Sequence, residues 1–513
     1  MPIRLSPVRL PLAALSTPVH KIRARVTAAR LLRYSSAIVL LPASPSDADW
    51  AALPFGRLLR EVYGLKTRKA GDSFELRVGA KADTLLTVGL VPAEASVFER
   101  LQLAGKLARA ALEAEPKSLL LFGLGSAEAL LAAIAGLQAA AFPLASFKSK
   151  PKPHVRLRGI DVAAALASAD LDRCVATAAG NNLARWLTAL PPNQLDARSY
   201  RRLLQELARR LKLKFTFYGE PKLRRLGAEA FLAVSRGNAT RDAGIVHLSY
   251  RGASARGSGA PRAAAPPDLS LVGKGICFDT GGTNLKPHKG MLDMHTDMEG
   301  SAVAVGSLYA LHALSSPLIV DCWLAITENR IGPTAYKPQD IIRAFNGTTI
   351  QVIHTDAEGR MVLADTLALA AAKKPRAIID YATLTGACVY ALTERYSGAF
   401  TNRPAARERI ESAGASSGER VWCFPMDADF DTDLESTVAD IMQCAVEGKG
   451  DHILAARFLN RFVPKEIPWL HLDLAAGART GGLAHIGTEI TGFGVRYTLE
   501  LLANGWPPKS KRT

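Results

Sequence analysis

The sequence lacks the patterns that mark disulfide-stabilised, membrane-spanning or repetitive proteins. Its six cysteines are scattered and form no C-x-x-C pair, which disfavours a disulfide framework and a structural zinc knuckle and fits a reducing compartment. The best candidate for a membrane span, residues 129–145, is short and interrupted by Gly, Gln and Pro. We therefore expect a buried helix there and no membrane partner. We find no internal repeat.

Acidic residues are missing from the N-terminus, where the first one is Asp47. We interpret residues 1–35 as a basic extension, which belongs either to a cytoplasmic protein or to a mitochondrial transit peptide. The whole chain carries a formal charge of +17, and residues 198–214 form a second basic stretch with helical periodicity. Two interpretations of this charge stay open: a solvated basic surface, or attraction to nucleic acid.

The length of 513 residues predicts more than one domain. Residues 36–150 alternate short apolar runs with helical patterns, which indicates a small α/β domain with a largely parallel sheet. Residues 151–167 are predicted to be a linker, because the segment FKSKPKPHVRLRG at 147–159 is charged and contains proline. A second α/β region is expected over 168–513.

One short motif, HTDAEGR at 354–360, places charges at every second position directly after an apolar, β-branched run. If the chain is extended there, Asp356, Glu358 and Arg360 share one face of a strand end. Such a group is costly to bury unless other charges compensate it. The alternative is a solvated turn with a surface ion pair.

A second charged segment favours the first interpretation. The run LSLVGKGICFDTGGTNLKP places Lys274, Asp279 and Lys286 at and after a predicted buried strand, and Asp297 precedes an apolar helix. Carboxylates at strand ends occupy the positions where open α/β sheets place their sites.

Four carboxylates in one pocket would repel one another. Two divalent cations would compensate them, and the oxygen-rich ligands suit Zn²⁺, Mn²⁺ or Mg²⁺. A metal pair of this kind can activate a shared water for hydrolysis. Lys274 can join such a site as a neutral amine. Lys286 and Arg360 then remain to stabilise an oxyanion or to hold a small anion.

Several motifs together resemble the leucyl aminopeptidase family, that is, the cytosol aminopeptidases of peptidase family M17. They are VGKGICFDTGG…LKP, TDMEGSA, HTDAEGR and DYATLTGAC, and the similarity continues through TGFGVRYTLELL at 491–502. The resemblance covers about the last two-thirds of the chain. It implies an α/β protein of two domains: an N-terminal macro-like domain, and a C-terminal catalytic domain with a central mixed sheet flanked by helices. It also implies a homohexamer acting on peptide substrates.

The resemblance assigns roles to the charged residues. Lys274, Asp279, Asp297 and Glu358 would bind the tighter of two metals, and Asp279 and Glu358 would bridge to a second metal completed by Asp356. Lys286 would polarise the scissile carbonyl, and Arg360 would hold a bicarbonate ion that serves as general base. The substrate's first side chain, leucine or another apolar one, would occupy a pocket of small and apolar residues: Met294, Thr383, Gly386, Ala475 and Ala478.

The sequence departs from the family pattern at three places. His354 stands where the family has Asn and is expected to be a structural neighbour of Asp356. Glu299 stands where the family has a small residue, and would either alter metal preference or cap the following helix. AAGAR at 475–479 replaces an AGTAW-like sequence. The rival hypotheses are a two-metal phosphoesterase and a basic DNA-binding or scaffold protein on the same fold.

Overall fold

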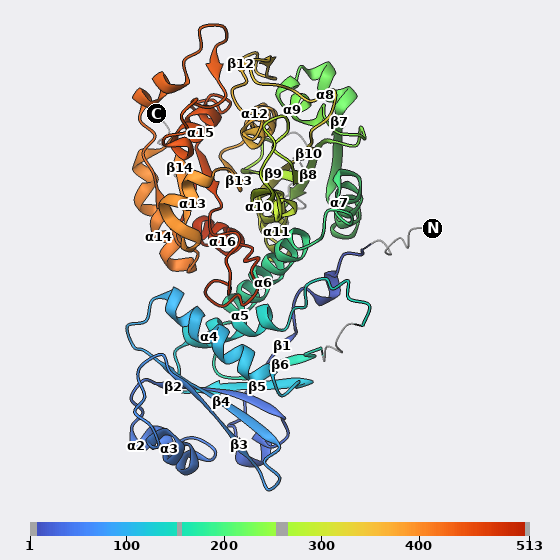
Figure 1. The fold of residues 1–513 in the computed structure, drawn as a ribbon. Helices are drawn as coiled ribbons and strands as arrows, with labels where there is room; N and C mark the ends of the chain where they lie inside the picture. The colour runs from blue at the N-terminus through green and yellow to red at the C-terminus, as the bar shows by residue number, and fades with distance from the viewer. Residues whose placement is uncertain (1–7, 151–155, 253–264, 508–513) are drawn as a thin grey trace.

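The computed structural model describes residues 8–150, 156–252 and 265–507. The chain forms two lobes, with the N-terminal lobe in blue and cyan below a larger lobe in green to red (Figure 1). Each lobe contains a central sheet covered by helices. This architecture confirms the predicted α/β fold with two domains.

The N-terminal lobe is built on a six-stranded sheet of order β1-β6-β5-β2-β4-β3. Only β3 within this sheet runs antiparallel to its neighbour. Strands β2 and β4 are apolar and buried along nearly their whole length, as expected for a sheet covered on both faces. The strands are β1 (Val19–Lys21), β2 (Ser36–Pro42), β3 (Ser73–Val78), β4 (Thr84–Val91), β5 (Ser118–Gly123) and β6 (Gly159–Ala163).

Two short strands of this sheet come from ranges expected to lie outside it. β1 belongs to the predicted extension 1–35, and β6 belongs to the predicted linker 151–167. They pair in parallel, with Val19 opposite Ile160. A boundary at residue 36 or 151 therefore divides the sheet. Strands this short carry too few residues to show an apolar pattern. Residues 1–7 and 151–155 of the two ranges lie outside the described residues.

Helices α4 (Val97–Leu112) and α5 (Ala127–Ala140) cover one face of the N-terminal sheet. Helix α5 overlaps the stretch 129–145 and is buried over most of its length, as predicted from its composition. It also contacts the second domain, because Asn182 donates a hydrogen bond to the Gln138 carbonyl at 3.1 Å. Within the part of the chain that the structure describes, no helix combines the length and apolar character that a bilayer crossing requires.

The C-terminal lobe contains an eight-stranded mixed sheet of order β15-β14-β17-β13-β9-β10-β8-β7. Its centre, β17-β13-β9-β10, is parallel, and antiparallel pairs flank it on both sides. The strands are β7 (Lys214–Gly219), β8 (Gly244–Arg251), β9 (Leu269–Asp279), β10 (Ile319–Asn329), β13 (Ile378–Ala382), β14 (Ser397–Thr401), β15 (Val421–Cys423) and β17 (Trp469–Asp473). A small separate sheet joins β11 (Ile341–Arg343), β12 (Thr349–Gln351) and β16 (Ile441–Met442).

Each face of the large sheet is covered by its own set of helices and its own apolar core. One core contains residues of α6 (Ser168–Thr188), α7 (Ala197–Leu211), α11 (Glu299–Ala313), α14 (Arg407–Ser417) and α16 (Val495–Ala503). The other contains residues of α8 (Glu220–Leu226), α9 (Glu229–Ser235), α12 (Glu358–Ala371) and α15 (Asp451–Asn460). Residues of β9 contribute to both, with Leu271 on one face and Val272 on the other.

Two glycines allow α6 and α11 to pack closely. A Cβ at Gly180 would collide with the Gly306 carbonyl oxygen, and a Cβ at Gly306 would collide with the Gly180 carbonyl oxygen. We expect Gly180→Ala to force the helices apart and to lower the free energy of unfolding by roughly 1–3 kcal/mol. Denaturant titration would measure this. The matched control is Gly64→Ala at the exposed end of α3 (Gly56–Gly64), where nothing lies within 4 Å. An equal loss in both variants would contradict the close-packing explanation.

Candidate metal centre

Three carboxylates converge at the carboxyl end of β9. Asp279 is the last residue of this strand, Asp356 lies in the turn before α12, and Glu358 is the first residue of α12. One carboxylate oxygen from each lies within 4.8 Å of the others. Asp279 and Glu358 are buried, and Asp356 is partly buried. The site therefore forms where parallel strands end, the usual position of sites in α/β sheets.

The HTDAEGR motif is not an extended strand end, so the prediction that its three charges share one strand face is wrong. β12 ends at Gln351, and α12 begins at Glu358. Side chains two residues apart on a helix are rotated by about 200° around the helix axis, so they point to nearly opposite sides. Glu358 accordingly faces the other carboxylates, whereas Arg360 is directed toward Gln443 and Asp451.

Lys274 lies on β9 and connects the carboxylate cluster to Asp297. Its Nζ atom is 2.7 Å from Asp297 Oδ1 and 2.9 Å from Glu358 Oε1. Burial alone would lower the pKa of Lys274, but these two carboxylates raise it above its ordinary value. The close approach depends on Gly359, because a Cβ at that residue would lie 2.7 Å from Lys274 Nζ. This is a direct structural reason for the glycine in the motif.

Lys286 reaches the cluster from the loop after β9. Its Nζ atom lies 3.0 Å from Asp279 Oδ2 and 2.6 Å from Asp356 Oδ1. Burial would lower the pKa of Lys286, and the surrounding carboxylates raise it instead. The ammonium is therefore held in its charged form next to the converging carboxylates.

Asn329 orients Asp279 and was not among the residues expected at the site. Its Nδ2 donates to Asp279 Oδ1 at 2.8 Å, and the Gly281 backbone N–H donates to the same oxygen at 2.8 Å. The other oxygen, Oδ2, is left to face Lys286. Asn329 ends β10, the neighbour of β9. A polar residue at the end of a buried strand was the one sequence signal that could have found it.

The carboxylate cluster is electrostatically strained and suited to cations. Burial and then neighbouring carboxylates raise the pKa of Asp356 to about 7. Burial raises the pKa of Asp297 to about 8 despite the nearby Lys274. The same causes raise the pKa of Glu358. Two buried oxygens, Asp297 Oδ2 and Glu358 Oε2, have no hydrogen-bond partner. Oxygen ligands of this kind fit divalent metal ions.

Of the five residues expected to line a substrate pocket, Thr383 contacts a charged residue of the site, and the others lie in separate segments. Met294 is in the short η4 helix (Met294–Thr296) that precedes Asp297. Thr383 follows β13, and its hydroxyl donates to Asp297 Oδ1 at 2.7 Å. Gly386 begins α13 (Gly386–Leu392), and Ala475 and Ala478 follow β17. Met294, Thr383 and Ala478 are partly exposed, Gly386 is exposed and Ala475 is buried.

His354 and Glu299, which depart from the family pattern, have different surroundings in the structure. His354 Nδ1 accepts a hydrogen bond from the Asp356 backbone N–H at 3.3 Å, as expected of a structural neighbour. Burial and then Lys286 lower the pKa of His354. Glu299 begins α11, and its carboxylate lies against Gly477. Burial and then Glu419 raise the pKa of Glu299 to about 8. Glu299 therefore faces a neighbouring carboxylate outside the metal cluster.

Arg360 is already paired with a carboxylate that sequence reasoning missed. Its side chain is 2% exposed, and Nη2 lies 2.8 Å from Asp451 Oδ1 and 2.7 Å from Asp451 Oδ2. Nη1 donates to the Gln443 carbonyl at 3.2 Å. Burial would lower the pKa of Arg360, but Asp451 raises it. Asp451 therefore occupies Nη2, and a bicarbonate ion expected at this guanidinium would compete with it for that nitrogen.

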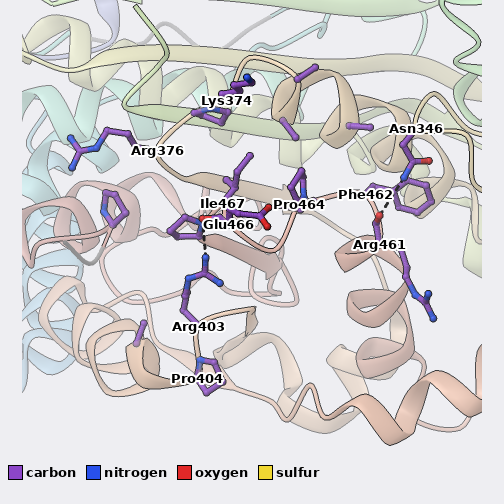
Figure 2. Close-up of a pocket in the computed structure, with 18 of the residues that line it drawn as sticks. Asn346, Lys374, Arg376, Arg403, Pro404, Arg461, Phe462, Pro464, Glu466 and Ile467 are labelled. Carbon is purple, nitrogen blue, oxygen red and sulfur yellow. Dashed lines mark hydrogen bonds between the residues drawn. The ribbon is translucent and has the colours of Figure 1, made fainter. Parts of the chain in front are cut away.

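One large pocket, drawn in Figure 2, has none of the cluster residues in its lining. It has a volume of about 1140 Å³ and is bordered by Pro375 and Pro468, which lie at the amino ends of β13 and β17. It also contacts Ala371, at the end of α12 opposite to Glu358. Apolar side chains such as Phe462 and Ile467 line it. The pocket therefore belongs to the opposite edge of the sheet.

Comparisons with known proteins give consistent similarities. The family model described as "Cytosol aminopeptidase family, catalytic domain" matches residues 182–499. A probable cytosol aminopeptidase of Rhodopseudomonas palustris is 34% identical over 465 residues, covering 86% of this chain and 89% of that relative. One of Chlorobaculum tepidum is 39% identical over 328 residues, but the match covers only 62% of its length and 63% of this chain. The solved structure of the bottromycin maturation enzyme BotP in complex with Mn is 30% identical. Its TM-score is 0.77, and the match covers 91% of this chain and 98% of that one.

Proposed function

The chain belongs to the cytosol aminopeptidase family, and from this premise we propose that it is a metal-dependent aminopeptidase that releases the first residue of peptides. The observation that carries the proposal is the carboxylate cluster at the end of β9 with Lys274 and Lys286 inserted into it. The position of Lys274 among the carboxylates also disfavours a phosphoesterase, since a lysine next to the D-x-E acids belongs to the aminopeptidase pattern. The solved Mn complex of a similar protein supports a divalent metal.

We assign two divalent ions to the cluster, Zn²⁺ or Mn²⁺, with Mg²⁺ as a further alternative. When bound, such a pair supplies an activated water and polarises the carbonyl of the substrate. The unpartnered oxygens of Asp297 and Glu358 support their assignment as ligands. The ligands proposed are Lys274, Asp279, Asp297, Asp356 and Glu358.

Lys286 is assigned to the scissile carbonyl. Its ammonium is held in place by Asp279 and Asp356 and stays charged, so it can donate a hydrogen bond to the oxygen as negative charge develops there. A donor fixed before the reaction needs no reorganisation during it. The side chain therefore stabilises the transition state more than the substrate.

The pocket residues favour an apolar first residue such as leucine. Met294 and Ala478 offer apolar surface, and Thr383 donates a hydrogen bond to the proposed ligand Asp297. This couples the position of the substrate's side chain to the reacting centre. A homohexamer and a cytoplasmic location, with a mitochondrial one as the alternative, stay predictions that rest on the resemblance. A role in nucleic-acid binding rests on charge alone and is not favoured.

The proposal predicts dependence on a free N-terminal amine, since only the first residue of a peptide is to be released. We expect the protein loaded with Mn²⁺ to release leucine from a leucine-initiated peptide and to leave the N-acetylated peptide intact. Mass spectrometry of the products measures both. Internal cleavage of the acetylated peptide would contradict the proposal. So would hydrolysis of a phosphodiester by a protein that leaves leucine p-nitroanilide intact.

A further inference from the structure

Arg360 forms an ion pair that requires an explanation, because its partner comes from a distant segment. The guanidinium is buried in the first turn of α12, where an unpaired charge would be costly. Asp451 is the first residue of α15, ninety-one positions along the chain. Both of its carboxylate oxygens approach the same nitrogen, Nη2. The chain thus provides its own anion at this arginine.

The backbone around Asp451 places its carboxylate at the start of a helix. Gly450 has a φ of 63°, which turns the chain so that α15 begins at Asp451. The first turn of a helix carries partial positive charge that stabilises a carboxylate. The Asp451 side chain is 26% exposed, whereas that of Arg360 is 2% exposed. One side of the carboxylate is therefore held by arginine, and another side is open.

The Arg360–Asp451 pair is connected to the turn that carries Asp356 through Gln443, whose carbonyl accepts from Arg360 Nη1 at 3.2 Å. Gln443 Oε1 accepts a hydrogen bond from the His354 backbone N–H at 3.1 Å, and the His354 ring in turn accepts from the Asp356 backbone N–H. The ion pair is therefore tied to the turn that leads to Asp356. A second anion added at Arg360 would face the Asp451 charge directly, and like charges at such short range disfavour each other.

We propose that Asp451 replaces bicarbonate in this protein, as a general base held by Arg360 that takes a proton from the attacking water. The inference rests on the proposed aminopeptidase function. The water oxygen forms a bond to the carbonyl carbon while its proton passes to the Asp451 carboxylate. The carbon–nitrogen bond then breaks, and the leaving amine takes that proton. Asp451 returns to its starting form, and no external base is consumed.

The test compares wild type with Asp451→Gly in buffer freed of carbon dioxide and in the same buffer with bicarbonate. We expect wild-type kcat/KM to be equal in both. The glycine variant opens the anion position, so it should lose roughly 10²–10⁴-fold without bicarbonate and recover part of the loss with it. Its metal content should match that of wild type. Carbon-13 NMR of labelled bicarbonate with metal-free protein should show binding to Asp451→Gly and not to wild type.

Two further variants keep the test decisive. Asp451→Asn retains the shape but cannot take a proton, so we expect low activity with and without bicarbonate. Asp431→Asn removes the partner of Arg457, a second ion pair of α15 at 2.6 Å, and should show no bicarbonate effect. Wild-type activity that falls on removal of bicarbonate would overturn the inference, as would full activity of either Asp451 variant without it. A wild type inactive under all conditions would instead refute the proposed function.

Discussion

Replacing Asp279 by Ala is expected to abolish both metal binding and peptide hydrolysis. Asp279 is oriented by Asn329 and the Gly281 N–H, and its oxygens lie within reach of those of Asp356 and Glu358. Removing it takes away the carboxylate proposed to bridge two ions. Because a metal supplies several kcal/mol of transition-state stabilisation, we expect kcat/KM to fall by at least roughly 10³-fold.

Metal analysis by mass spectrometry and a leucine p-nitroanilide assay on the same preparation measure both effects. The control is Asp268→Ala, which lies just before the opposite end of β9 and pairs with exposed Arg376 at 3.1 Å. This variant should keep its metal and its activity. If Asp279→Ala retained a full complement of metal, the bridging role assigned to Asp279 would be wrong.

Lys286→Ala should produce the second large effect, on catalysis without loss of metal. The ammonium contacts Asp279 and Asp356 but carries positive charge, so its removal leaves the proposed oxygen ligands intact. Losing one preorganised donor to a developing oxyanion costs about 10²–10³-fold in kcat. We therefore expect low kcat at normal metal content.

The matched control is Lys289→Ala, three residues further along the chain on an exposed position. It should leave kcat unchanged. This result would show that loss of a positive charge near the site is not sufficient to lower kcat. Simultaneous loss of metal and activity in Lys286→Ala would show that this lysine holds the site together rather than acting on the substrate.

The sequence predicted which acids come together but not how the chain turns among them. Asp279 and Asp297 could be identified because each follows or precedes a clear apolar element. In HTDAEGR, two acids separated by one residue, Asp356 and Glu358, fit the end of a strand and the start of a helix equally well. Periodicity over so few residues could not separate the two, and the direction of Arg360 was therefore predicted wrongly.

Partners from distant segments were beyond the reach of local patterns. Asp451 stands in the stretch EGKGDHIL, where an acid directly after a glycine is typical of an ordinary helix start. Its contact with Arg360 arises only because α12 and α15 share one face of the large sheet. β1 and β6 were missed for a related reason, since their pairing joins segments more than a hundred residues apart.

Metal titration of the wild-type protein tests the central claim most directly. Protein stripped with a chelator should be inactive on leucine p-nitroanilide, and activity should return in proportion to bound Mn²⁺ or Zn²⁺. Because Asp297 and Asp356 have raised pKa values in the metal-free site, binding must displace protons and should weaken as pH falls below about 7. The account predicts saturation at two ions per chain. Full activity in the stripped protein, or saturation with metal but no hydrolysis, would contradict it.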